Sequence, residues 1–319
     1  MNPLKASLRF GGATAAAVAL ALLVSTQAAA SSLDPEAAAQ ADVADVAAQV
    51  SAVAPDLGDT VPVTEAADGE FVSQGAVDLT APADGDGTIS LGNGDLAITL
   101  APEASSAEGV LAQDGTLVYP ADDTGVATAV QPLDSGVRIQ TVLADADAAT
   151  SFSYTLEGVD LAIQPDGSIA LYPEGTLTSG VTATGIGFID APWAFDAAGA
   201  AVPTHYEVAG DTFVQIVEPP ADAAYPVVAD PTAWWGMYWN VSSTTANRLS
   251  ALLYAGAGVA GIVSALITAG IVTAPGALAT GLAAGIMAIG GAVLSYCNAA
   301  GRGIVIKKPW VGPVWCESR

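Results

Sequence analysis

The sequence predicts an antiparallel β body, a sandwich or open barrel, with a short N-terminal helix before it and a C-terminal α-helical hairpin after it. Three observations support this fold. Apolar and polar residues alternate in short runs between residues 71 and 217, and turn-forming pairs separate the runs. Residues 251–299 contain no charged side chain. Residues 34–54 carry valines at helical spacing.

Residues 1–30 are predicted to be a secretory signal peptide and not part of the fold. Lys5 and Arg9 precede an apolar run at residues 14–24, and the alanines at residues 28–30 offer small side chains to a signal peptidase. The apolar run is too short for a comfortable membrane span. We therefore expect an extracellular protein that is associated with the cell envelope or membrane.

Residues 31–70 are expected to form a helix and then a linker. Asp34 is placed to cap the helix, and Pro35 falls in the first turn, where proline is tolerated. One narrow stripe faces a single direction and consists of Val43, Val46, Val50 and Val53. Because the stripe is narrow, the helix should lean on another element. Residues 56–69 are polar and punctuated by proline and glycine, which indicates a linker.

Residues 71–222 are predicted to form an acidic antiparallel β domain. The strongest hairpin signal is Asn93-Gly94, and further turns are expected at Asp114-Gly115, Asp166-Gly167 and Gly210-Asp211. About ten short strands with turn signals every 8–12 residues are typical of a sandwich or open barrel. No helix-length pattern interrupts them, which disfavours a parallel α/β sheet.

The charge is uneven along the chain. Residues 31–230 contain 32 acidic residues and one basic residue, Arg138, a formal charge of −31, whereas residues 231–319 contain five basic residues and one acid, a charge of +4. The acidic body should repel phosphates, so we expect no nucleic-acid partner. Two interpretations stay open: the acidic surface only keeps the protein soluble, or it masks the cationic tail.

Residues 223–243 join these two parts and contain a seam, YPVVADP at residues 225–231, followed by a tryptophan-rich stretch. Tyr225, Pro226, Asp230 and Pro231 mark the seam. Its two prolines bracket a short extended run that suits a rigid connection or an exposed edge strand. The Asp230-Pro231 bond is also a candidate processing point.

Residues 244–319 are predicted to form an apolar hairpin that is divided near Pro275. Arms of about 24 and 22 residues, at ~1.5 Å per residue, would each span a ~30 Å hydrocarbon core. Ala257 with Gly261, and Gly281 with Gly285, have the four-residue spacing of close helix packing in lipid.

Three readings of this hairpin remain: an anchor, a membrane-disrupting segment held by the body until release, and a hairpin packed in a soluble protein. Two helices that are apolar all round bury only one side each against a sheet, which favours lipid or self-association.

Aromatic and basic residues bracket the hairpin as an interfacial belt would. The predicted anchors are Trp234, Trp235, Trp239, Lys307, Lys308, Trp310 and Trp315. In the alternative, the tryptophans fill a core against the β domain. Cys297 and Cys316 are expected to form a disulfide, because an exported chain meets an oxidising compartment. The disulfide would contribute about 3 kcal/mol.

We find no sequence motif for catalysis, and we predict a protein that is not an enzyme and has no cofactor or metal. His205 is the single histidine after the signal, and no GxSxG, HExxH, P-loop or dinucleotide-binding motif occurs. Residues 83–88 and 144–147 are rich in aspartate but lack the ligand spacing of a calcium loop. A carbohydrate-binding sandwich is an alternative that rests on fold analogy.

The seam, the tryptophan-rich stretch, the Gly/Ala-rich hairpin and the β segment at residues 192–217 resemble a family of uncharacterised secreted proteins of high-GC Gram-positive bacteria. The resemblance covers about residues 60–319 and is most specific at residues 192–235. It implies secretion and a β body joined to an apolar C-terminal part, and it implies no enzyme activity. The tails of some members look bacteriocin-like in composition.

We therefore expect a hairpin that inserts in or associates with membranes, in a bacteriocin-like or other membrane-active protein, with the acidic body as carrier or mask. A lipid bilayer and a second copy of the chain are the expected partners. The alternative is an envelope structural or carbohydrate-binding protein in which the hairpin only anchors or oligomerises.

Overall fold

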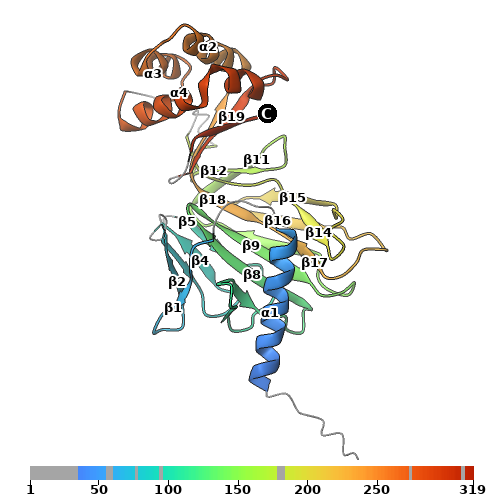
Figure 1. The fold of residues 1–319 in the computed structure, drawn as a ribbon. Coiled ribbons are helices and arrows are strands. Elements are labelled where there is room, and N and C mark those ends of the chain that lie inside the picture. The colour runs from blue at the N-terminus through green and yellow to red at the C-terminus, as the bar shows by residue number, and fades with distance from the viewer. Residues whose placement is uncertain are drawn as a thin grey trace, which may run out of the picture.

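The computed structural model describes residues 35–54, 60–75, 78–92, 96–177, 184–272, 275–309 and 313–319. The predicted signal peptide, Asp34, the Asn93-Gly94 turn, Trp310 and residues 56–59 of the expected linker lie outside these residues. Figure 1 shows a central β body, one helix lying along its side, and a layer of helices at the far end.

The β body consists of two antiparallel sheets that enclose one apolar core, which confirms the predicted β architecture. The first sheet has the order β1 (Thr64–Glu65), β2 (Phe71–Gln74), β3 (Asp78–Ala81), β4 (Thr88–Leu91), β5 (Leu96–Thr99), β10 (Ser151–Thr155), β16 (Thr212–Val217) and β15 (Thr204–Ala209).

The second sheet contains the longest strands. Its main path is β11 (Val159–Ile163), β12 (Ile169–Pro173), β13 (Gly185–Ile189), β18 (Thr232–Val241), β9 (Gly136–Leu143), β8 (Val126–Leu133), β7 (Leu117–Tyr119) and β6 (Val110–Leu111). The strands off this path are β14 (Ala194–Asp196), β17 (Val227–Ala229), β19 (Ile304–Pro309) and β20 (Trp315–Ser318).

Period-two alternation supplies the core between the sheets. In β4 and β5, Ile89, Leu91, Leu96 and Ile98 are all buried, and the residues between them are less so. Each such side chain contributes about 1.5–3 kcal/mol when it leaves water. Strands β8 and β9 are buried along their whole lengths. The other sheet covers one face, and side chains of the N-terminal helix pack on the other.

The N-terminal helix α1 (Pro35–Val53) packs on the outer face of the second sheet, as its valine stripe predicted. Val43 packs in a cluster with Val118 of β7, and Val50 packs in a cluster with residues of β8, β9 and β17. Val43 and Val50 are fully buried. The helix therefore closes the one face of the long strands that the first sheet does not reach.

The seam lies inside the second sheet and is neither a linker nor an exposed edge strand. Strand β17 pairs with both β9 and β14, and Asp230 and Pro231 are buried. Tyr225 and Pro226, joined by a cis peptide bond, are half-buried. The alternative of an exposed edge strand is therefore wrong, since long-range pairing with β9 and β14 encloses this segment.

The apolar C-terminal segment folds as three helices, α2 (Ser243–Tyr254), α3 (Val259–Thr268) and α4 (Ala277–Cys297). The second predicted arm corresponds to α4, which has 21 residues and a non-helical backbone at Gly290. The first arm is not one continuous helix, because a turn at residues 255–258 separates α2 from α3. Gly256 in this turn has φ 75°, a conformation that favours glycine.

Strand β18 connects the β body to this C-terminal part without a linker. Its first residues pair with β9 and β13, and its last six pair with β19. We call residues 242–319 the helical module. Its core includes side chains from all three helices and from β18 and β19. The apolar helices α3 and α4 therefore have partner surface within the protein, which α2 and the β18–β19 pair provide.

Candidate functional site

The apolar outer surface of the helical module is the most unusual feature of the described chain. The sequence has no charged residue between Arg248 and Arg302. Within the described residues, one helix is long and apolar enough to cross a membrane: residues Ala279–Cys297 of α4 have a mean hydropathy of 1.6, and only 28% of that window is buried. A core helix of this composition would be mostly buried.

Large apolar side chains emerge from this surface. The exposed ones in the helical module are Tyr254 (68% exposed), Met287 (39%), Val293 (50%) and Tyr296 (82%). Tyr254 ends α2, and the other three belong to α4. We call these four residues, with the groove described next, the apolar surface.

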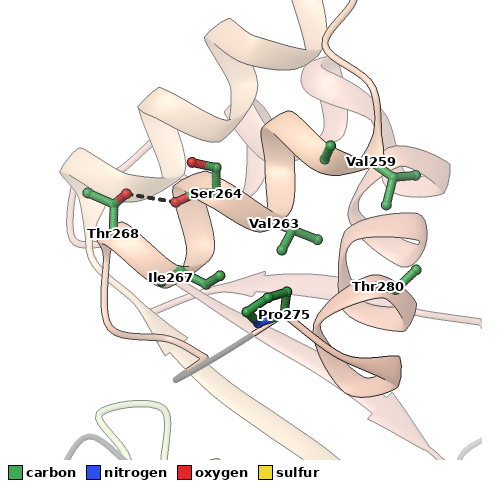
Figure 2. A pocket seen from close by; sticks show the side chains of 8 residues that line it. Val259, Val263, Ser264, Ile267, Thr268, Pro275 and Thr280 are labelled. Atoms are coloured by element: carbon green, nitrogen blue, oxygen red, sulfur yellow. Dashed lines mark hydrogen bonds between the residues drawn. The ribbon is translucent and has the colours of Figure 1, made fainter.

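An apolar groove of about 600 Å³ opens between α3 and the start of α4. It is lined by Val259, Ala260, Val263, Ser264, Ile267, Thr268, Pro275 and Thr280. Figure 2 shows Val263 and Ile267 of α3 directed towards Pro275. The Thr268 hydroxyl donates to the carbonyl oxygen of Ser264 at 2.7 Å, so this polar group is already satisfied within α3.

The exposed cations of the module lie away from the groove. The Asn298 side chain donates to the Ser243 hydroxyl at 3.0 Å and to Asn247 Oδ1 at 2.9 Å, which joins the end of α4 to the start of α2. Arg248 and Arg302 are near this junction in sequence, and both are exposed. Residues 255–280, at the other end of α2, form a charge-free end.

The predicted glycine pairs do not bring helices together as expected. A Cβ atom on Gly285 would lie 2.3 Å from Val314 of the C-terminal segment, whereas one on Gly281 would meet nothing within 4 Å. A Cβ on Gly261 would approach only Ala257, at 3.3 Å. The close helix contact is instead at Gly291, where an added Cβ atom would lie 3.2 Å from the Ser250 carbonyl oxygen of α2, and Gly291 belongs to neither predicted pair.

Two predicted interfacial anchors are interior residues, which corrects the belt interpretation for them. Trp239 is 2% exposed, and its indole N–H donates to Thr184 Oγ1 at 3.1 Å. Lys307 is also 2% exposed, with Nζ 2.8 Å from Glu317 Oε2 and 3.7 Å from Asp190 Oδ1. The carboxylates of Glu317, in β20, and of Asp190, which follows β13, thus compensate for the removal of the ammonium group from water.

Trp234 and Trp315 complete this arrangement, which we call the ionic hub. Trp234 Nε1 donates to Asp190 Oδ2 at 2.7 Å, and Trp315 Nε1 donates to Glu317 Oε1 at 2.9 Å. Desolvation raises the pKa of the Asp190 carboxyl, although Lys307 opposes the shift. The ionic hub joins the body to the module, because Lys307 of the module contacts Asp190 of the body. The indole side chains of Trp234 and Trp315 are half-buried.

The remaining predicted anchors are placed only in part. Lys308 is half-buried in β19. Trp235 lies in β18, but its side chain, like all of Trp310, is outside what the structure describes.

The predicted disulfide is confirmed. Cys297 at the end of α4 is bonded to Cys316 in β20, over a sequence separation of 19. Cys297 is buried and Cys316 is half-buried. The bond fixes the most apolar helix to the C-terminal strand.

Asp230 of the seam belongs to a buried polar cluster between the two sheets. Its Oδ1 accepts hydrogen bonds from Gln215 Nε2 at 3.1 Å and from the Trp193 backbone N–H at 2.9 Å. Burial is the main reason that the pKa of Asp230 is raised well above its usual value. The Tyr206 hydroxyl faces the same carboxyl, and burial also raises the pKa of Tyr206. This cluster links the sheets and is closed to solvent, so we read it as structural.

His205 lies at the surface, 3.9 Å from Glu207, in an exposed pair. In the part of the chain that the structure describes, no group of three or more His, Cys, Asp or Glu side chains is arranged to hold a metal. The apolar surface is the candidate site, and its chemistry suits contact with apolar matter.

Comparison with protein-family models, with curated proteins and with solved structures finds no match to this chain, so the candidate site is interpreted from its own residues.

Proposed function

We propose that this is a secreted, non-enzymatic protein that attaches to lipid bilayers through the apolar surface of the helical module, while the acidic β body stays in water. The observation that carries the proposal is the low burial of the apolar window in α4, 28%, whereas the long strands β8 and β9 of the body are buried throughout. Contiguous exposed apolar surface marks sites of membrane or protein contact.

The exposed side chains provide enough free energy for reversible attachment. Burial of a large apolar side chain contributes about 1.5–3 kcal/mol, so partial burial of Tyr254, Met287, Val293 and Tyr296 is worth several kcal/mol. Micromolar binding corresponds to about 8 kcal/mol. The groove between α3 and α4 adds further apolar area.

The positions of the cations favour shallow insertion. Arg248 precedes Tyr254 by six residues, about 9 Å along α2. The charge-free end can therefore enter the acyl region to roughly this depth before the guanidinium reaches the headgroups, where each cation contributes about 1 kcal/mol on an anionic surface.

The acidic body would orient the protein on such a surface. Residues 31–230 carry a formal charge of −31, which anionic headgroups repel, whereas residues 231–319 carry +4. Because β18 pairs with β9 of the body and with β19 of the module, the body acts as a permanent carrier of the module. A buried Asp230-Pro231 bond gives no support to release of the tail by cleavage there.

Vesicle co-sedimentation tests the proposal. The mature protein should sediment with phosphatidylcholine vesicles that contain phosphatidylglycerol, and Val293→Asp should reduce binding at least tenfold. Ile163→Asp is the matched control, because Ile163 is also 50% exposed but lies in β11 of the body. Absence of sedimentation, or equal losses in the two variants, would contradict membrane attachment.

Two further measurements distinguish membrane disruption, simple anchoring and self-association. Release of an entrapped dye would identify membrane disruption, whereas binding without release would identify an anchor. Sedimentation velocity without lipid would reveal self-association through the same surface, and Val293→Asp should then dissociate the oligomer.

The carbohydrate-binding alternative has less support. The described tryptophan side chains, Trp193, Trp234, Trp239 and Trp315, are buried or half-buried, so the exposed aromatic faces that a sugar platform needs are limited to tyrosines such as Tyr254 and Tyr296. Retention on washed peptidoglycan that survives Val293→Asp would favour this alternative over the membrane.

A further inference from the structure

The C-terminal strand β20 lies between the apolar helix α4 and the β body. On the side of α4, the Cys297–Cys316 disulfide fixes the strand to the last residue of the helix. About three turns earlier in α4, Val314 packs against Gly285 so closely that there is no room for a Cβ atom on the glycine. The C-terminal segment therefore touches α4 at two separated points.

The same strand is held to the body by different contacts. It pairs with β19 from Ile304↔Ser318 to Lys307↔Trp315. The Trp315 ring meets the Phe188 ring of β13 edge to face, with centroids 6.0 Å apart. Glu317 pairs with the buried Lys307 at 2.8 Å, and Lys307 in turn pairs with Asp190 of the body. Tension on α4 would thus pass through β20 to the ionic hub.

The other helices packed on α4 do not restrain it in this way. Helix α3 and the last turn of α2 lie in the charge-free stretch and would enter an apolar phase together with α4. Cys316 and Val314, by contrast, belong to a segment that ends in Glu317, Ser318 and Arg319 and that shares a sheet with the body. A change in the depth of α4 is therefore opposed by this segment, in addition to the Asn298 hydrogen bonds and the short connection from α4 to β19.

We propose that residues 313–319 form a disulfide-locked strap that limits insertion of α4, and that reduction of Cys297–Cys316 lets α4 enter a bilayer more deeply. The inference rests on the proposed membrane attachment and adds its regulation. The strap accounts for two features together: a disulfide at the end of the most apolar helix, and a glycine that admits Val314 against the middle of that helix.

The chemical step is a thiol–disulfide exchange with a dithiol reductant. A reductant thiolate attacks Cys316 Sγ, the more accessible sulfur, and Cys297 leaves as a thiolate and is protonated. The second reductant thiol then attacks the mixed disulfide and releases Cys316. The protein gains two electrons and two protons, and the dithiol becomes a disulfide.

The test uses the full mature chain with anionic vesicles, in oxidised form and after reduction by a phosphine. Depth is read from quenching of tyrosine and tryptophan emission by brominated lipids, and the strap is read from hydrogen exchange of α4 and residues 315–318 without lipid. Reduction should increase membrane-inserted protein at least fivefold and accelerate exchange in both segments at least tenfold.

Variants separate the strap from the sulfur chemistry. Cys297→Ser with Cys316→Ser should behave like the reduced protein. Val314→Gly keeps the disulfide but removes the contact at Gly285, so it should give a smaller increase in insertion. Ile163→Ala, at an exposed site on the body, should change neither readout.

Each outcome decides the inference. Equal insertion of oxidised and reduced protein, or less insertion after reduction, would overturn the strap. If neither form binds vesicles, the proposed attachment fails, and hydrogen exchange still decides whether reduction frees α4. If the double serine variant does not fold, reduction of the folded protein and Val314→Gly give the answer.

Discussion

The β body and the helical module differ in how completely they bury their apolar side chains. Each sheet of the body is covered on its inner face by the other, α1 covers part of an outer face, and most of the described acids lie outside. The module has three helices on one side of a strand pair, and α4, an apolar helix, stays largely open. The difference teaches that apolar composition alone does not bury a helix. It needs partners around its whole circumference, and here the chain supplies them on one side.

Aromatic truncation should separate the two regions most strongly. Phe213→Ala in the body should lower the free energy of unfolding by about 3–5 kcal/mol, because Phe213 is 1% exposed and its ring packs on Tyr154 and Tyr206. Met287→Ala on the apolar surface should cost well under ~1 kcal/mol. Urea titrations followed by circular dichroism measure both, and similar losses would erase the contrast drawn here.

Loss of the disulfide should destabilise one region only. Replacement of both cysteines by serine should cost about 3 kcal/mol, because the unfolded chain regains the freedom of a loop of about 20 residues. Hydrogen exchange should accelerate in α4 and β20 but not in β8 or β9. Faster exchange across the whole sandwich would mean that module and body unfold as one unit.

Two glycines of α4 should respond in opposite directions to the same change. Gly285→Ala should destabilise the module by about 1–3 kcal/mol, because the new methyl group overlaps Val314. Gly281→Ala has open space and should stabilise the helix by about 0.4–1 kcal/mol. Thermal melts of the two variants, matched in chemistry and in helix, measure the difference. A loss at both sites would point to a helix partner at Gly281.

The pH dependence should reside in the body. The raised pKa of Asp230 means that the folded state holds a proton which the unfolded state releases above about pH 4, so this group lowers stability as pH rises from there to the folded pKa. Its contribution is at most about 1.4 kcal/mol per pH unit.

Asp230→Asn should remove that slope, as denaturant titrations of both proteins between pH 5 and 8 would reveal. Asp122 acts in the opposite sense. Backbone hydrogen bonds from Ser106 and Thr124 lower its pKa to about 2, so its stabilisation is present above about pH 4 and is lost as pH falls through 2. Identical slopes for the wild type and Asp230→Asn would show that the buried carboxyl does not titrate in this range.

Local sequence patterns were sufficient to predict much of the fold. Alternation and turn pairs indicated the antiparallel strands, the valine stripe indicated a helix that packs on something, and two cysteines in an exported chain indicated the disulfide. The candidate site was harder to predict. The charge-free run was visible in the sequence, but the division of its first arm at Gly256 and the groove between α3 and α4 were not.

The sequence by itself determined the elements whose signal is periodic and local: the strands of the body, α1, and an apolar C-terminal segment that ends in a crosslink. Tertiary structure alone decided which residues of the seam and the expected belt are interior. Asp230 is buried because β17 inserts between β9 and β14, and Lys307 is buried because β13 and β20 bring Asp190 and Glu317 to it. The physical reason is that burial of a charge depends on partners distant in sequence, and no local period records where those partners will lie.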